Sequence, residues 1–144
     1  MRSTIIAVGG RDVELFFSTR AMLFISERCG GDISDLGGWL TEGSTSDKMG
    51  KIGLVIADLA NGAIIKHNAD IALGLENGQK RPLYPDDYFI DVLNPGEFLK
   101  YKDKIFEALN LGQDFEIPEN IVIEEKDADL AEIEAEKQKN FPGA

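Results

Sequence analysis

The first 17 residues place hydrophobic and polar side chains in two short alternating runs separated by glycines. Residues 3–8 fit a β-strand, residues 9–12 fit a turn around Gly9-Gly10, and residues 13–17 fit a second strand with only partial alternation. This pattern predicts an N-terminal β-hairpin.

A helical spacing of hydrophobic residues replaces the alternation after the hairpin. Ser18 or Thr19 is a suitable N-cap, apolar residues recur up to Cys29, and Gly30-Gly31 is suited to end a helix. Residues 34–42 then form a short segment whose helical content the sequence leaves open.

The longest hydrophobic stripe lies between residues 49 and 73. Asn61-Gly62 weakens the helical pattern, because a glycine inside a helix costs about 1 kcal/mol relative to alanine. Apolar positions nevertheless continue at helical spacing as far as Leu73, so we expect one long, interrupted helix. The first half of its stripe consists of Met49, Ile52, Ile56 and Leu59.

Two shorter helices are predicted after an exposed loop at residues 74–83. Pro85 and the acids that follow it suit the start of a helix that runs to about Leu93. The stretch from Asn94 to Glu97 combines an N-cap, a first-position proline and an acid, and so predicts a final helix that ends at residues 111–112.

Together these elements predict an α+β, mostly α-helical fold, in which an N-terminal β-hairpin packs on a bundle of about four to five helices. The globular domain should span residues 1–112. Residues 113–144 carry ten Asp or Glu against three Lys, a net charge of −7 out of −11 for the whole chain. Since this segment has few apolar residues, we expect an acidic, flexible tail.

Composition narrows the classes of partner and the compartment. An isoelectric point near 4.5 disfavours binding to nucleic acid or anionic lipid, because phosphate contacts need clustered Lys and Arg. The chain has no run of about 20 apolar residues, no recognisable secretory leader and a single cysteine. We therefore expect a cytoplasmic protein that binds other proteins, with a homo-oligomer as a further option.

Candidate catalytic residues are sparse. His67 and Asp70 share a helical face, and Cys29 is the one available thiol. Their spacing is ordinary helical adjacency, and the C-terminal end of a helix disfavours a thiolate. We interpret His67 as a surface residue and Cys29 as a buried structural one, and we expect no enzymatic activity.

Motifs for metals and cofactors also fail on spacing. Residues 43–51 lack the glycine spacing and the Ser or Thr of a phosphate-binding loop, and residues 127–129 lack the glycine and glutamate of a calcium loop. Asp86, Asp87 and Asp91 are explained as charges at the start of a helix. No cofactor or metal site is predicted.

Two features remain as candidates for binding a partner. The stripe of Met49, Ile52, Ile56 and Leu59 is typical of a core, and the same pattern suits a groove that accepts a partner helix. The acidic tail is either a solubilising appendage or an arm that orders on contact with a second protein.

The order of elements is similar to that of the tail assembly chaperones of long-tailed bacteriophages. The similar parts are the strand at residues 13–17 leading into the helix and glycines at 18–31, the segment 33–36, the long helix including residues 64–70, and the final helix from residues 93–97 to 108–112. The resemblance covers residues 1–112 and is one of pattern.

The resemblance implies a small helical protein in the cytoplasm of the bacterial host. Such proteins bind the long, aggregation-prone tape measure protein and help to recruit tail tube protein during tail assembly, and they are absent from the mature virion. Many also occur in a longer, frameshifted form, for which residues 138–140 suit a slippery adenine run in the RNA.

A second class of function fits the charge. An acidic inhibitor or DNA mimic would block a basic partner with carboxylates laid out on a rigid surface. Deletion of residues 113–144 would abolish such an inhibitor, whereas a chaperone domain would still hold its client.

Overall fold

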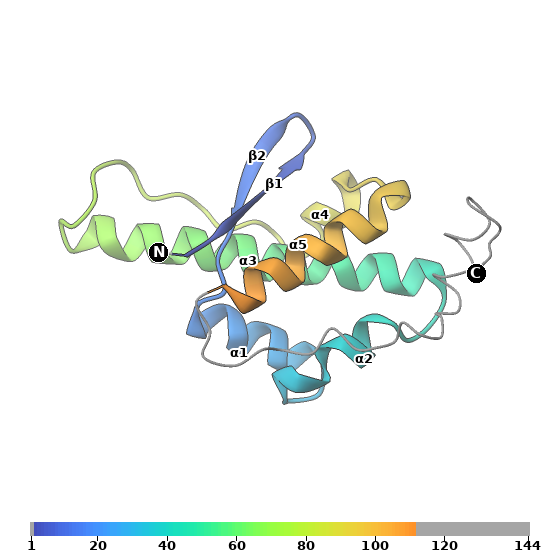
Figure 1. Ribbon diagram of the computed structural model, residues 1–144. Coiled ribbons are helices and arrows are strands. Elements are labelled where there is room, and N and C mark those ends of the chain that lie inside the picture. Colours follow the sequence, from blue (N-terminus) through green and yellow to red (C-terminus); the bar gives the residue numbers. More distant parts are fainter. Residues whose placement is uncertain (1, 112–144) are drawn as a thin grey trace.

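The computed structural model describes residues 2–111, which form two strands, five α-helices and two short 3-10 helices (Figure 1). The acidic tail at 113–144, and with it the predicted domain boundary, lies outside the described residues. In chain order the elements are β1 (Thr4–Val8), β2 (Arg11–Leu15), α1 (Thr19–Arg28), η1 (Ile33–Asp35), α2 (Leu36–Leu40), α3 (Thr45–Ala72), α4 (Tyr88–Val92), η2 (Pro95–Glu97) and α5 (Phe98–Asn110).

The predicted hairpin is present, and its turn is tighter than the sequence suggested. Gly9 and Gly10 both have positive φ, as a two-residue hairpin turn that follows the strand twist requires. Arg11 therefore pairs directly with Val8, and β2 begins there rather than at residue 13. One face of the hairpin is buried, through Thr4, Ile6, Val8, Val13 and Leu15.

The helix after the hairpin begins and ends as predicted. The Ser18 side chain accepts a hydrogen bond from the Ala21 amide and caps α1. At the other end, the Gly31 amide donates to the Ser26 carbonyl, and Gly30 has positive φ. The segment that the sequence left open is η1 followed by α2, whose Leu36 and Leu40 are buried.

The longest helix, α3, runs for 28 residues without a break. Ser44 and Asp47 form a reciprocal capping box at its start. Gly62 does not interrupt it, and the reason for the glycine is steric: a Cβ at this position would lie 2.5 Å from the Phe16 carbonyl oxygen. The chain between β2 and α1 thus crosses α3 in direct contact with its backbone, and the Phe16 amide donates to the Leu59 carbonyl.

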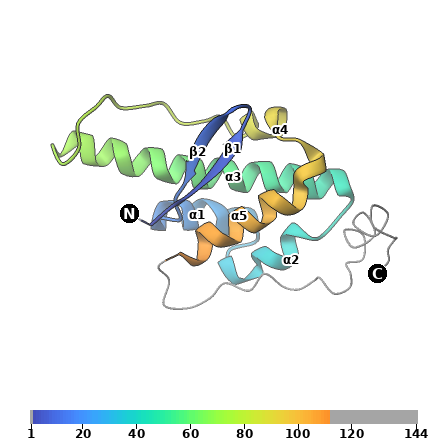
Figure 2. The same ribbon diagram turned by 45° about the horizontal axis from the view of Figure 1, so that its top comes forward.

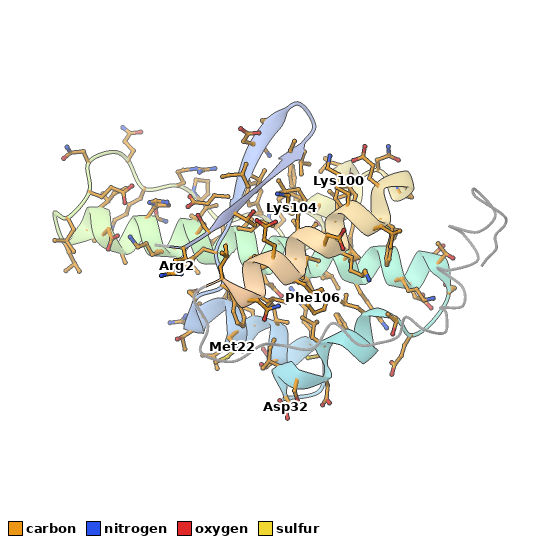
Figure 3. The ribbon with its side chains drawn as sticks, viewed as in Figure 1. Arg2, Met22, Asp32, Lys100, Lys104 and Phe106 are labelled. Carbon is orange, nitrogen blue, oxygen red and sulfur yellow. The ribbon has the colours of Figure 1, made fainter. Side chains whose placement is uncertain are left out.

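The last two helices differ from expectation only at their starts. No side-chain cap from Asp87 opens α4, which begins at Tyr88 and not at Pro85. Asn94 caps η2, the turn that leads into α5, through a bond from the Gly96 amide to its side chain. α5 is amphipathic: Lys100 and Lys104 extend from one side and the buried Phe106 from the other (Figure 3).

α3 is the central element, since β2, α1, α2, α4 and α5 all contact it. The hairpin and α4 lie on one side of α3, and α1 and α2 lie on the other (Figures 1 and 2). The predicted α+β, mostly helical fold is confirmed. No helix within residues 2–111 combines the length and apolar content of a membrane span.

The C-terminal end of α3 is less enclosed than its middle. Residues Val55 to Ile64 are buried, whereas residues 65–71 are partly or fully exposed. Both ribbon views show this end, with the loop that follows it, projecting past the hairpin and α1 (Figures 1 and 2).

Candidate functional site

The predicted partner-binding stripe lies in the core. Ile52, Ile56 and Leu59 are fully buried, and Met49 is partly buried against the same cluster. In the folded domain these side chains belong to, or pack against, the single core cluster rather than lining an open groove. The interpretation of the stripe as core residues therefore accounts for it.

His67 does not pair with Asp70. Its Nδ1 lies 2.8 Å from the Glu76 carboxylate and its Nε2 lies 2.9 Å from the Glu14 carboxylate, while Asp70 pairs with Lys66. Hydrogen bonds to Glu76 and then to Glu14 raise the pKa of His67. The two carboxylates lie at opposite nitrogens of the ring, so they do not converge on a common metal ion.

The other residues considered for chemistry have structural roles. Cys29 is buried, and burial together with Asp35 raises the pKa of its thiol, so the reactive thiolate is disfavoured. The Lys51 ammonium donates to the Trp39 and Glu42 carbonyls and so caps the end of α2. Among residues 2–111, no cluster of His, Cys, Asp or Glu side chains is arranged to hold a metal.

Hydrogen bonds at several points hold the exposed loop after α3 to that helix. We call residues 73–83 the anchored loop. The helix ends in a Schellman motif, in which Gly74 has positive φ and the Leu75 amide donates to the Asp70 carbonyl. His67 then holds Glu76, as described above. The start of the loop is thus fixed to the last turns of α3.

Two asparagines on α3 hold the end of the loop and the residue that follows it. The Asn68 amide donates to the Arg81 carbonyl at 2.8 Å and accepts from the Arg81 amide at 2.9 Å. Asn61 makes the same pair of bonds with the Tyr84 backbone. Because the asparagines are seven residues apart, they lie on one face of α3. Each side-chain amide thus pairs with one backbone N–H and one C=O group, as a neighbouring strand would. Without it these backbone groups would face water.

The anchored loop nevertheless presents large apolar side chains to solvent. Leu73 is 73% exposed and Leu75 is 74% exposed, the highest values among the large hydrophobic residues described. In a Schellman motif, the residue at the position of Leu75 usually packs on the one at the position of Asp70. Here that partner is an acid and the residue before it is the small Ala69, so the helix leaves Leu75 largely uncovered.

A pocket of about 440 Å³ lies where the anchored loop returns to the body of the protein. Three elements form it, namely α1, α3 and the segment that ends the loop. Its lining residues are Phe24, Glu27, Arg28, Asp58, Asn61, Leu83, Tyr84 and Asp86.

An ion pair forms the floor of this pocket. Arg28 donates to both carboxylate oxygens of Asp58, at 2.6 and 3.0 Å, and lies 3.4 Å from Asp86. The Asp58 side chain is 4% exposed. Burial raises the pKa of the Asp58 carboxyl, and the hydrogen bonds from Arg28 oppose part of that rise.

Arg11 holds the hairpin tip against the same region. Its guanidinium donates to the hydroxyls of Tyr84 and Tyr88 at 3.0 and 2.7 Å and lies 5.6 Å from the centre of each ring. Tyr84 is thus held through its side chain by Arg11 and through its backbone by Asn61.

Comparison of the chain with protein families, with curated proteins and with solved structures finds no match. The sequence predicts an exposed loop at residues 74–83, but it predicts neither the hydrogen bonds that hold this loop to α3 nor the pocket. The seven-residue spacing of Asn61 and Asn68 is a signal for the first. The sequence carries no such signal for the pocket, because the charged groups of the pocket come from three separate segments.

Proposed function

We propose that the protein is a non-catalytic chaperone of phage tail assembly, which binds the tape measure protein and helps to recruit tail tube protein in the cytoplasm of the host bacterium without entering the virion. The proposal joins the family resemblance over residues 1–112 to one structural observation. That observation is the pair of leucines, Leu73 and Leu75, exposed on a loop that is otherwise firmly held.

The leucine pair supports binding to an apolar partner. Full burial of a leucine side chain is worth about 1.5–3 kcal/mol, so exposure of two of them forgoes a comparable stabilisation in the free protein. The anchored loop has few conformations to lose on binding, because His67 and Asn68 hold it at Glu76 and Arg81, and Asn61 holds Tyr84 directly after it. A partner that covers both leucines gains this energy at a small cost in ordering.

The charge of the chain supports the same role. A chaperone that covers an aggregation-prone client has to keep the complex in solution, and a net charge of −11 on 144 residues favours this. Holding a client in this way needs no chemical step and no energy source.

Co-expression with the tape measure protein of the same phage tests the proposal. We expect the wild-type chain to keep the tape measure protein soluble and the Leu73→Ser/Leu75→Ser variant to lose this ability. Leu23→Ser is the control, because Leu23 is also an exposed leucine, at 56%, and lies on α1, outside residues 73–83. A tape measure protein that stays insoluble with the wild-type chain, or stays equally soluble with the double variant, would refute the proposal.

A further inference from the structure

We infer that the pocket lined by Arg28, Asp58 and Leu83 accepts a lysine or arginine side chain of the partner. This inference rests on the proposed function to the extent that the ligand belongs to a protein. It specifies that the partner contributes a basic side chain, which neither the resemblance nor the exposed leucines indicate.

The charges of the pocket favour a cation. Glu27, Asp58 and Asp86 contribute three carboxylates against the single guanidinium of Arg28, so the lining carries a net charge of −2 at neutral pH. An anionic ligand would meet this excess of negative charge in a partly enclosed space, where charges are less screened than on an open surface.

The Arg28 guanidinium is already paired with a carboxylate of the protein itself and is not free to bind an anionic ligand. Its two hydrogen bonds to Asp58 are bidentate, and only 22% of its side chain is exposed. An incoming carboxylate would have to displace Asp58, which would then remain buried without a partner. Arg28 therefore neutralises the charge of the buried Asp58, and the carboxylates of Glu27 and Asp86 at the rim keep the opening of the pocket negative.

The rim carboxylates are accessible. The Asp86 side chain is 73% exposed, and Glu27 is exposed on α1. No hydrogen bond or ion pair joins Glu27 to another residue within 2–111. A cationic group that enters the pocket can thus reach Glu27 and Asp86 without breaking an internal ion pair other than the 3.4 Å contact between Arg28 and Asp86.

The walls fit the rest of such a side chain. Phe24, Leu83 and Tyr84 provide apolar surface around the carboxylates. Lysine and arginine carry a charged head on an apolar stem, and the stem is commonly buried along such surfaces. A volume of about 440 Å³ lies in the usual range for ligand pockets, roughly 300–1,000 Å³, and it accommodates a long side chain with some water.

Leu83 connects the pocket to the proposed binding surface, because it ends the anchored loop and also lines the pocket. We therefore expect the client segment to combine apolar residues, which cover Leu73 and Leu75, with a basic residue that enters the pocket.

Titration of the ¹⁵N-labelled full chain with N-acetyl-lysine methylamide, followed by amide NMR shifts, tests the inference. We expect shifts at pocket residues such as Phe24, Asn61 and Leu83, and these should weaken as salt is added. The norleucine analogue, which has the same stem without the charge, should bind much more weakly.

Two charge-matched variants complete the test. Glu27→Gln/Asp86→Asn should weaken binding of the lysine probe by roughly 5- to 10-fold. Asp87→Asn/Asp91→Asn removes the same net charge from exposed residues outside the pocket and should leave binding nearly unchanged.

The inference is overturned if the lysine probe shifts no pocket amide, if the norleucine probe binds equally well, or if both variants weaken binding alike. Any of these results leaves the proposed function standing as long as the leucine variants still fail to hold the client. If the leucine double variant keeps the tape measure protein as soluble as the wild type does, the proposed function is refuted. The result with the lysine probe is then interpreted independently of that function.

Discussion

The Nε2 atom of His67 lies 2.9 Å from the carboxylate of Glu14 and joins the exposed end of α3 to β2. The Nδ1 atom of the same ring holds Glu76 in the anchored loop. A neutral imidazole has one N–H group and would leave one carboxylate facing a ring lone pair, whereas the protonated ring donates to both. The geometry therefore favours the charged form, in agreement with the raised pKa of His67.

This arrangement predicts that stability falls as the pH rises above the ordinary pKa of histidine, about 6.5. The pKa of His67 is raised in the folded state from its ordinary value of about 6.5, so the folded protein binds the proton more tightly than the unfolded chain does. The stabilisation is fully present below the unfolded pKa and is lost as the pH rises through the folded one. Thermal unfolding measured from about pH 5 to pH 9 detects this loss.

The control for this measurement is His67→Gln, which removes the single histidine of the chain. Its melting temperature should lack the decline that the wild type shows between the two pKa values. A wild-type profile that is flat or rises with pH in this range would contradict the role given to His67.

The close approach at Gly62 predicts that adding a single methyl group at this position of α3 lowers the free energy of unfolding. In Gly62→Ala the new Cβ would meet the Phe16 carbonyl at 2.5 Å and Ala21 at 3.1 Å, so the crossing between α3 and the chain after β2 has to open. We expect a loss of about 1–3 kcal/mol in the free energy of unfolding, measured with urea.

Gly50 provides the matched control, because it lies in the same helix and an added Cβ would meet nothing within 4 Å. Gly50→Ala should raise stability by up to about 1 kcal/mol through helix propensity alone. Equal effects of the two substitutions would show that the close approach at Gly62 is unimportant.

The ion pair of Arg28 and Asp58 predicts strong coupling between two residues. Arg28→Leu leaves the Asp58 carboxylate buried without its partner and should cost about 3–5 kcal/mol. Replacement of both residues by leucine removes the buried charge and should recover most of this loss. Urea unfolding of both single variants and the double variant measures the coupling, and additive losses would argue against it.

Most of the fold followed from local signals in the sequence. Gly9-Gly10, the Ser18 cap and the Asn94 cap each act within a few residues of their own position, so the elements that they bound could be predicted. The role of Gly62 could not be predicted from its neighbours in the sequence. Its effect depends on Phe16, which lies 46 residues earlier in the chain and contacts it only after folding.

The candidate site was largely hidden from the sequence for the same reason. The stripe from Met49 to Leu59 is periodic, and its periodicity predicts the side of the helix that is buried. Leu73 continues that pattern, and Leu75 falls in the loop that the sequence predicts after it. Their exposure becomes visible only when the end of α3 is seen to project beyond the elements that cover its middle (Figure 1).

Photo-cross-linking from the anchored loop tests the central claim most directly. A photoreactive phenylalanine analogue placed at Leu75 should cross-link to the tape measure protein when the two are co-expressed, whereas the same analogue at Leu23 on α1 should not. Cross-links from position 23 without any from position 75, or none from either position in a soluble complex, would contradict the account.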